Sequence, residues 1–171
     1  VLTFEPGDTP VGAQLRRIVL SPETGDLSPR TEALIYAADK AEHVHALVLP
    51  ALSRGAVVIT DRYVDSTLAY QGAGRGVTDD DLAEVERIAR WATQDLRPHL
   101  TVVLDLDPAA GLARFEGRDR IEAEGPEFHA RVRAAYLALA AAEPGRFLVV
   151  DASCPVEEIA AEIRRRLDGR V

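Results

Sequence analysis

Methionine is absent from the 171 residues, and cysteine and tryptophan occur once each. The single Cys154 cannot form an internal disulfide, and so low a cysteine content is typical of a reducing, cytosolic compartment. No apolar run approaches the roughly 20 residues that a membrane-spanning helix needs, and no signal peptide is recognisable. These absences argue against a disulfide-stabilised secreted domain and a membrane protein, and they predict a cytoplasmic location.

An excess of positive charge is also missing. The formal net charge is −8 and the isoelectric point is about 5.0, which argues against a nucleic-acid partner held by counterion release. Apolar residues make up 47% and charged residues 28%, as in ordinary globular proteins. Because there is no internal repeat, linker or low-complexity segment, we predict a single domain over residues 1–171.

One stretch, residues 55–76, concentrates the chemistry. Residues 56–60 are apolar and β-branched, which predicts a strand buried on both faces. Asp61 and Arg62 follow at its carboxyl end, the edge at which open α/β sheets bind ligands. The polar side chains beyond them are Ser66, Thr67, Tyr70, Gln71 and Arg75. This crowding predicts a phosphate-handling site next to a pocket for a small ligand.

Further apolar runs alternate with helical patterns. Residues 1–4 are extended and apolar, and residues 101–106 and 147–151 read as buried strands. Strands that alternate with helices predict a parallel sheet covered by helices on both faces. The chain opens directly on a strand, which, with the lack of methionine, hints at truncation.

A long helix is predicted over residues 31–53. Its expected core face recurs at steps of three and four residues: Leu34, Ala38, Ala41, Val44, Val48 and Leu52. Tyr36 and Lys40 are four residues apart on a neighbouring face and could reach one ligand. The alternative is a boundary tyrosine and a solvated lysine.

Two other clusters admit a plain structural interpretation. Asp79, Asp80 and Asp81 could suggest a metal site, but negative charge at a helix amino end explains them better. The arginines of residues 114–122 form either a mobile basic loop or a solvated turn. Trp91 is expected in the core or in a subunit contact.

The order of motifs resembles the bacterial thymidylate kinases. The motifs are Glu5-Pro6-Gly7, Ala37-Ala38-Asp39, Asp61-Arg62-Tyr63, Ala69-Tyr70-Gln71-Gly72, Asp119-Arg120-Ile121-Glu122 and Glu127-Phe128-His129. The resemblance implies a three-layer α/β/α fold with a parallel sheet, of the P-loop nucleoside monophosphate kinase type. It also implies phosphorylation of dTMP to dTDP with ATP and Mg²⁺, in dTTP biosynthesis, by a homodimer.

Roles carried over from the family fall into two groups. On the acceptor side, Arg62 contacts the phosphate with Arg75 as a second contact, Tyr36 stacks on thymine and Tyr70 packs under the deoxyribose. The remaining acceptor contacts are Glu5, Pro6, Lys40, Ser66, Thr67 and Gln71. On the donor side, Asp61 holds Mg²⁺ and residues 114–125 form a lid. In that lid Arg114 lies over adenine, and Arg118 or Arg120 reaches the transferring phosphoryl group.

Three departures from the family pattern matter, and one is a short lid, which leaves open whether Arg118 or Arg120 is catalytic. No G-x-x-x-x-G-K-[ST] phosphate loop occurs in the sequence, so we expect an incomplete enzyme, inactive alone, that lacks the amino-terminal βα unit and its central strand. Lys40 replaces the usual arginine, which alters base recognition. The alternatives are a kinase for another deoxynucleoside monophosphate and a non-catalytic nucleotide-binding domain. The Glu5–Pro6 peptide is a candidate for the cis form.

Overall fold

The computed structural model describes residues 1–113 and 119–168. It contains four parallel strands in two separate pairs: β1 (Leu2–Thr3) with β2 (Ile59–Thr60), and β3 (Thr101–Asp105) with β4 (Phe147–Asp151). Parallel neighbours need long crossover connections, and the helical segments between the strands supply them. The predicted α/β class is confirmed. The expected central strand is not tested and stays a prediction.

The helices begin and end as follows: α1 (Pro10–Leu20), the short 3₁₀ segment η1 (Pro22–Thr24), α2 (Pro29–His43), the π-helix η2 (Val44–Val48), α3 (Leu49–Ser53), α4 (Val64–Thr67), the π-helix η3 (Leu68–Gly74), α5 (Asp79–Ala92), α6 (Pro108–Leu112), α7 (Pro126–Ala142) and α8 (Val156–Leu167). The uninterrupted run α2–η2–α3 confirms the long predicted helix. None of the described helices is long and apolar enough to cross a membrane.

Side-chain caps explain where several helices start. The Thr9 hydroxyl accepts a hydrogen bond from the Gly12 amide at 2.8 Å, and Pro10 occupies the first turn of α1. Thr78 caps α5 in the same way, with all three aspartates in its first turn. The aspartates therefore lie where helix capping predicts them.

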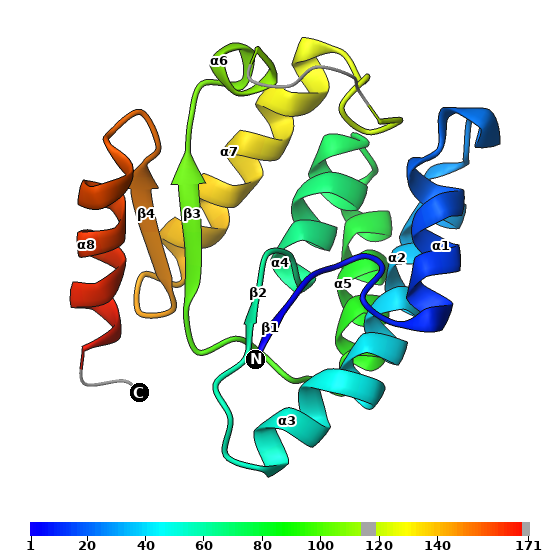
Figure 1. The fold of residues 1–171 in the computed structure, drawn as a ribbon. Helices are drawn as coiled ribbons and strands as arrows, with labels where there is room; N and C mark the ends of the chain where they lie inside the picture. The colour runs from blue at the N-terminus through cyan, green and yellow to red at the C-terminus, as the bar shows by residue number, and fades with distance from the viewer. Residues whose placement is uncertain (114–118, 169–171) are drawn as a thin grey trace.

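The two strand pairs have different helical surroundings. Figure 1 shows α7 behind β3 and α8 beside β4, whereas α1, α2 and α5 lie on the other side of the molecule, near β1 and β2. Tyr136 of α7 packs against two core clusters, one built around Phe128 and the other around Phe147. It thereby links the helices that flank the site to the β3–β4 pair.

Two predictions of buried apolar surface are wrong. Strand β2 has only two residues, and Val57 and Ile59 are 49% and 57% exposed, so the strand is not buried on both faces. On α2, Leu34 is 55% exposed, and most of the side chains that this helix buries are polar or charged. The fully or almost fully buried side chains there include Glu32, Asp39, Lys40 and His43. Trp91 is 82% exposed and so does not belong to the core.

An ion pair and a hydrogen bond join α4, the helix after β2, to the β3–β4 pair. Asp65 of α4 accepts two hydrogen bonds from the Arg146 guanidinium, at 2.7 and 2.8 Å, and one from the Thr101 hydroxyl at 2.7 Å. Thr101 begins β3 and Arg146 precedes β4. The side chains of Asp65 and Arg146 are only 6% and 12% exposed. We call these three residues the α4 clamp.

We predict that Asp65→Asn lowers the free energy of unfolding by about 3 kcal/mol, because it removes the buried carboxylate bound to Arg146 and leaves this mostly buried arginine paired with the more exposed Glu143. Urea unfolding measures the change. The matched control is Glu84→Gln, which breaks the exposed Glu84–Arg87 pair and should cost no more than about 0.5 kcal/mol. Equal effects of the two substitutions would show that the α4 clamp does not stabilise the fold.

Candidate active site

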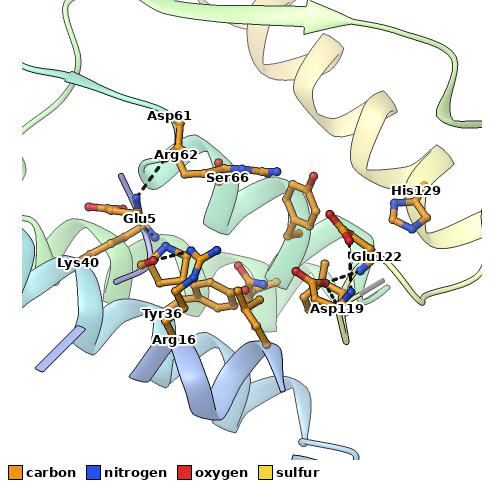
Figure 2. A pocket seen from close by; sticks show the side chains of 15 residues that line it. Glu5, Arg16, Tyr36, Lys40, Asp61, Arg62, Ser66, Asp119, Glu122 and His129 are labelled. Carbon is orange, nitrogen blue, oxygen red and sulfur yellow. Dashed lines mark hydrogen bonds and ion pairs between the residues drawn. The ribbon is translucent and has the colours of Figure 1, made fainter. Parts of the chain in front are cut away.

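A pocket opens at the carboxyl ends of β1 and β2. Figure 2 shows side chains from α1, α2, α4 and the segment before α7 converging on it. The lining residues are Glu5, Pro6, Arg16, Leu20, Tyr36, Lys40, Asp61, Arg62, Ser66, Tyr70, Gln71, Asp119, Ile121, Glu122 and His129. The location agrees with the rule that open α/β sheets bind ligands beyond the carboxyl ends of their strands.

The turn after β1 is anchored on α2. The Glu5–Pro6 peptide is cis, and Gly7 has a φ of 121°, which favours glycine. The Gly7 amide donates to Oδ1 of Asp39 at 3.0 Å. A Cβ on Gly12 would lie 2.5 Å from the same oxygen, so this close approach also requires glycine.

Lys40 is buried beside this turn. Its Nζ lies 3.2 Å from Oε2 of Glu5 and 5.5 Å from the centre of the Tyr36 ring. The Lys40 side chain is 2% exposed, so the alternative of a solvated lysine is wrong. On the far side of Glu5, His43 contacts Oε1 at 2.6 Å. The Glu5 carboxylate thus holds a cation at the wall of the pocket.

The residues after β2 supply a carboxylate, a guanidinium and a hydroxyl to the pocket. Oδ1 of Asp61 accepts from the Glu5 amide at 3.2 Å, which ties the ends of β1 and β2 together. The Arg62 guanidinium lies 4.7 Å from the centre of the Tyr70 ring. The hydroxyls of Ser66 and Tyr136 are 2.7 Å apart, which fixes α4 against α7.

A second arginine in the pocket, Arg16, is not among the residues that the sequence predicts. Its Nη1 donates to the Pro6 carbonyl at 2.7 Å, and its guanidinium lies 5.8 Å from the centre of the Phe4 ring. Arg16 and Arg17 are adjacent in α1, and composition alone cannot say which one faces the ligand. Among the described residues, the pocket is therefore lined by two guanidinium groups, those of Arg16 and Arg62.

A buried carboxylate, Glu32, organises the floor of the site. Its oxygens accept from Gln71 Nε2 at 3.1 Å, from Arg75 at 3.0 and 2.6 Å, and from Arg120. Burial alone would raise the pKa of Glu32, but the hydrogen bonds from Arg75, Gln71 and Arg120 together lower it. Glu32 is 0% exposed and joins α2, η3 and the segment before α7. The sequence gives a weak indication that Glu32 belongs to the site, because Glu32, Tyr36 and Lys40 recur at helical spacing.

Not every predicted site residue lies in the pocket. Arg75 and Arg120 do not line it and instead bind Glu32. Thr67 is buried, and its hydroxyl has no partner within residues 1–113 and 119–168. Arg114 and Arg118 lie outside the described residues.

The far wall carries groups that the sequence does not single out for the site. Oδ1 of Asp119 accepts from the amides of Ile121 and Glu122, both at 2.8 Å, so a tight turn orients this wall. The ring of His129 packs edge-on against Phe128, and its buried Nε2 has no partner in the described part of the chain. Their placement depends on how this segment folds back onto η3.

Asp61 is the residue best placed to meet a metal ion. Its Oδ1 takes the Glu5 amide, whereas Oδ2 makes no hydrogen bond to a described residue. No group of three or more potential metal ligands occurs among the described residues. Mg²⁺ commonly binds one or two carboxylates together with substrate phosphates and water. A single carboxylate oxygen at the pocket edge fits a metal that arrives with a nucleotide.

The fold and the pocket define an α/β protein with a candidate ligand site at the ends of parallel strands, lined by arginines together with aromatic and amide side chains. The family model for thymidylate kinase matches residues 1–163. The chain belongs to the thymidylate kinase family, and is thus a kinase.

Individual relatives agree. A thymidylate kinase of Leifsonia xyli subsp. xyli is 61% identical, over 100% of this chain and 81% of that protein. One of Cutibacterium acnes is 52% identical, over 99% and 81%. The crystal structure of thymidylate kinase from Ehrlichia chaffeensis superposes with a TM-score of 0.76 at 26% identity, covering 98% of this chain and 80% of that one.

The lowered pKa of Glu32 makes stability depend on pH. Because the folded-state pKa lies below the usual 4.5, the stabilisation is fully present above pH 4.5 and is lost as the pH falls through the folded value. We predict that, below pH 4.5, the unfolding free energy of Glu32→Gln falls less steeply with decreasing pH than that of the unaltered protein. The difference in slope should be up to about 1.4 kcal/mol per pH unit. Urea unfolding between pH 3 and pH 7 measures the slope.

The control for this prediction is Glu42→Gln, which removes a carboxylate from the same helix without touching the Glu32 cluster. Part of the acid sensitivity should persist in both variants, because hydrogen bonds from Arg146 also lower the pKa of Glu143 to about 2. Identical slopes for Glu32→Gln and the unaltered protein would contradict the assignment.

Proposed function

We propose that this kinase transfers the γ-phosphoryl group of ATP to dTMP, and that the pocket at the ends of β1 and β2 is the dTMP site. The observation that carries the proposal is that the guanidiniums of Arg16 and Arg62 line the same pocket as Tyr36, Tyr70 and Gln71. Guanidinium groups bind phosphate through paired hydrogen bonds and keep their charge. The aromatic and amide wall suits a nucleobase.

The acceptor phosphate is assigned to Arg16 and Arg62. Both guanidiniums are held by contacts within the protein. Arg16 donates a hydrogen bond to the Pro6 carbonyl, and Arg62 lies against the ring of Tyr70. Because both side chains are held before a ligand arrives, less rotamer entropy is lost on binding. Phosphoryl transfer depends chiefly on positioning and charge neutralisation, which these groups supply.

The base and sugar are assigned to the aromatic and amide side chains of the pocket. The ring of Tyr36 offers a stacking surface, and Lys40 and Gln71 offer polar contacts at its edge. Tyr70 packs edge-on against Phe128 and Tyr136, with ring centres 6.0 and 6.3 Å apart. So fixed a ring beneath the sugar would collide with a 2′-hydroxyl, which supports a preference for deoxyribonucleotides.

Mg²⁺ is assigned to Asp61, where it would neutralise charge on the transferring phosphoryl group. Asp61 and Arg62 follow each other in the chain, so metal and acceptor phosphate would be held on adjacent residues of one rigid strand end. A homodimer stays a proposal as well, for which the exposed Trp91 offers a contact surface.

We predict that dTMP at 100 times its dissociation constant raises the unfolding free energy of the full-length gene product by about 2.7 kcal/mol. UMP at the same concentration should leave the thermal midpoint unchanged. Arg16→Gln should abolish the dTMP shift, whereas Arg17→Gln, one residue along the same helix, should retain it. A steady-state assay with ATP and a panel of dTMP, dUMP, dCMP and dGMP identifies the acceptor. If dTMP neither shifts the midpoint nor yields dTDP, the proposal is wrong.

A further inference from the structure

The side-chain amide of Gln71 is held in one orientation by Glu32. Gln71 lies on η3, is 3% exposed and lines the pocket, and its Nε2 is 3.1 Å from Oε1 of Glu32. An ionised carboxylate can only accept hydrogen bonds, so the amide must turn its NH₂ group toward it. The assignment of nitrogen and oxygen in this amide therefore follows from the chemistry of its partner.

Glu32 is in turn fixed by two cations. Arg75 binds both of its oxygens, through Nε at 3.0 Å and Nη2 at 2.6 Å, and Arg120 binds Oε2. Arg120 is itself anchored by a hydrogen bond from its Nε to the Val19 carbonyl at 2.9 Å. With a charged donor on each oxygen, Glu32 stays ionised and cannot rotate away from Gln71.

The consequence lies at the other end of the amide. The hydrogen bond to Glu32 uses Nε2, so Oε1 of Gln71 lies at the other end of an amide whose side chain lines the pocket. Gln71 therefore presents an acceptor to the ligand. Thymine and uracil carry a hydrogen on N3 and can donate to it, whereas N3 of cytosine is itself an acceptor and would face Oε1 unpaired.

We propose that Glu32 is a specificity-determining positioning residue: it locks Gln71 so that the pocket accepts a pyrimidine with an N3 hydrogen and rejects cytosine. Glu32 does not line the pocket and acts only through Gln71. This inference rests on the proposed function, because it takes the pocket to be the nucleoside monophosphate site. An amide free to rotate could satisfy either base, since it has a donor at one end and an acceptor at the other.

The test compares the dissociation constants of dTMP and dCMP by calorimetry, in the full-length gene product and in Glu32→Gln. The unaltered protein should bind dTMP at least about tenfold more tightly than dCMP, because an unpaired buried acceptor costs about that much. In Glu32→Gln the new side chain can face Gln71 with either end, so Gln71 can turn. The preference should then fall by about tenfold. Glu42→Gln, on the same helix, should keep the original preference.

The ratio separates a specificity role from a structural one. If Glu32→Gln weakens both nucleotides by the same factor and leaves the ratio unchanged within about twofold, Glu32 is only structural and the inference is wrong. A protein that binds dTMP and dCMP equally well contradicts the inference but leaves a deoxynucleotide kinase in place. Binding of neither nucleotide contradicts the proposed function itself, and the inference with it.

A second variant covers the case in which Glu32→Gln does not fold. Glu32→Asp keeps the negative charge. The long side chains of Arg75 and Arg120 can move to stay in contact with the shorter carboxylate. The substitution withdraws the carboxylate by one methylene from Gln71, whose shorter side chain is fixed on η3. The same fall in preference, of smaller size, is expected. An unchanged preference in this folded variant would overturn the inference.

Discussion

Charge buried along the inner face of α2 has to be neutralised inside the protein, and the site is built from the side chains that do so. An isolated buried ion costs several kcal/mol, so each one must be paired or hydrogen-bonded. Glu32 is paired with Arg75 and Arg120, and Lys40 with Glu5. Arg75 directly follows η3, Arg120 lies in the segment before α7, and Glu5 lies in the turn after β1. Three walls of the pocket are therefore docked onto a single helix by ionic contacts.

This arrangement couples the stability of the site to its shape. An apolar helix face tolerates small rotations, because apolar contacts have no preferred direction, whereas a carboxylate that accepts several hydrogen bonds fixes the position of each donor. The α4 clamp acts in the same way farther from the pocket. It holds the residues after β2 against β3 and β4 through Asp65 and Arg146. Polar contacts thus fix the geometry, and the clusters around Phe128 and Phe147 supply apolar burial.

The sequence predicts the features that depend on local chemistry. Residues 147–151 form a strand as expected, and the site lies at the carboxyl ends of β1 and β2, as the rule for parallel sheets requires. The caps at Thr9 and the three aspartates are equally local. Nine of the predicted substrate contacts or metal ligands follow from motif order and converge on one pocket: Glu5, Pro6, Tyr36, Lys40, Asp61, Arg62, Ser66, Tyr70 and Gln71.

The inward face of α2 could not be predicted because the rule used to find it assumes that buried residues are apolar. Leu34 and Ala38 recur with a helical period and are exposed, while Glu32, Asp39 and His43 recur with the same period and are buried. A polar period of this kind indicates a solvated face unless partners exist elsewhere in the chain. For Glu32 those partners lie 39 to 88 residues away. Only the tertiary fold brings them together.

The roles of the arginines illustrate the same difficulty. A sequence with a net charge of −8 and a phosphate site suggests that each arginine near a motif serves the phosphate. In the structure Arg75 and Arg120 neutralise Glu32, and the pocket retains Arg16 and Arg62. Two guanidiniums match the double negative charge of a phosphate monoester. Asp61, Asp119 and Glu122 add negative charge to the same pocket and so disfavour a ligand with a larger anionic group unless a cation accompanies it. Under the proposed function, this balance among the described residues favours a monophosphate at Arg16 and Arg62 and an ATP that arrives with its metal ion.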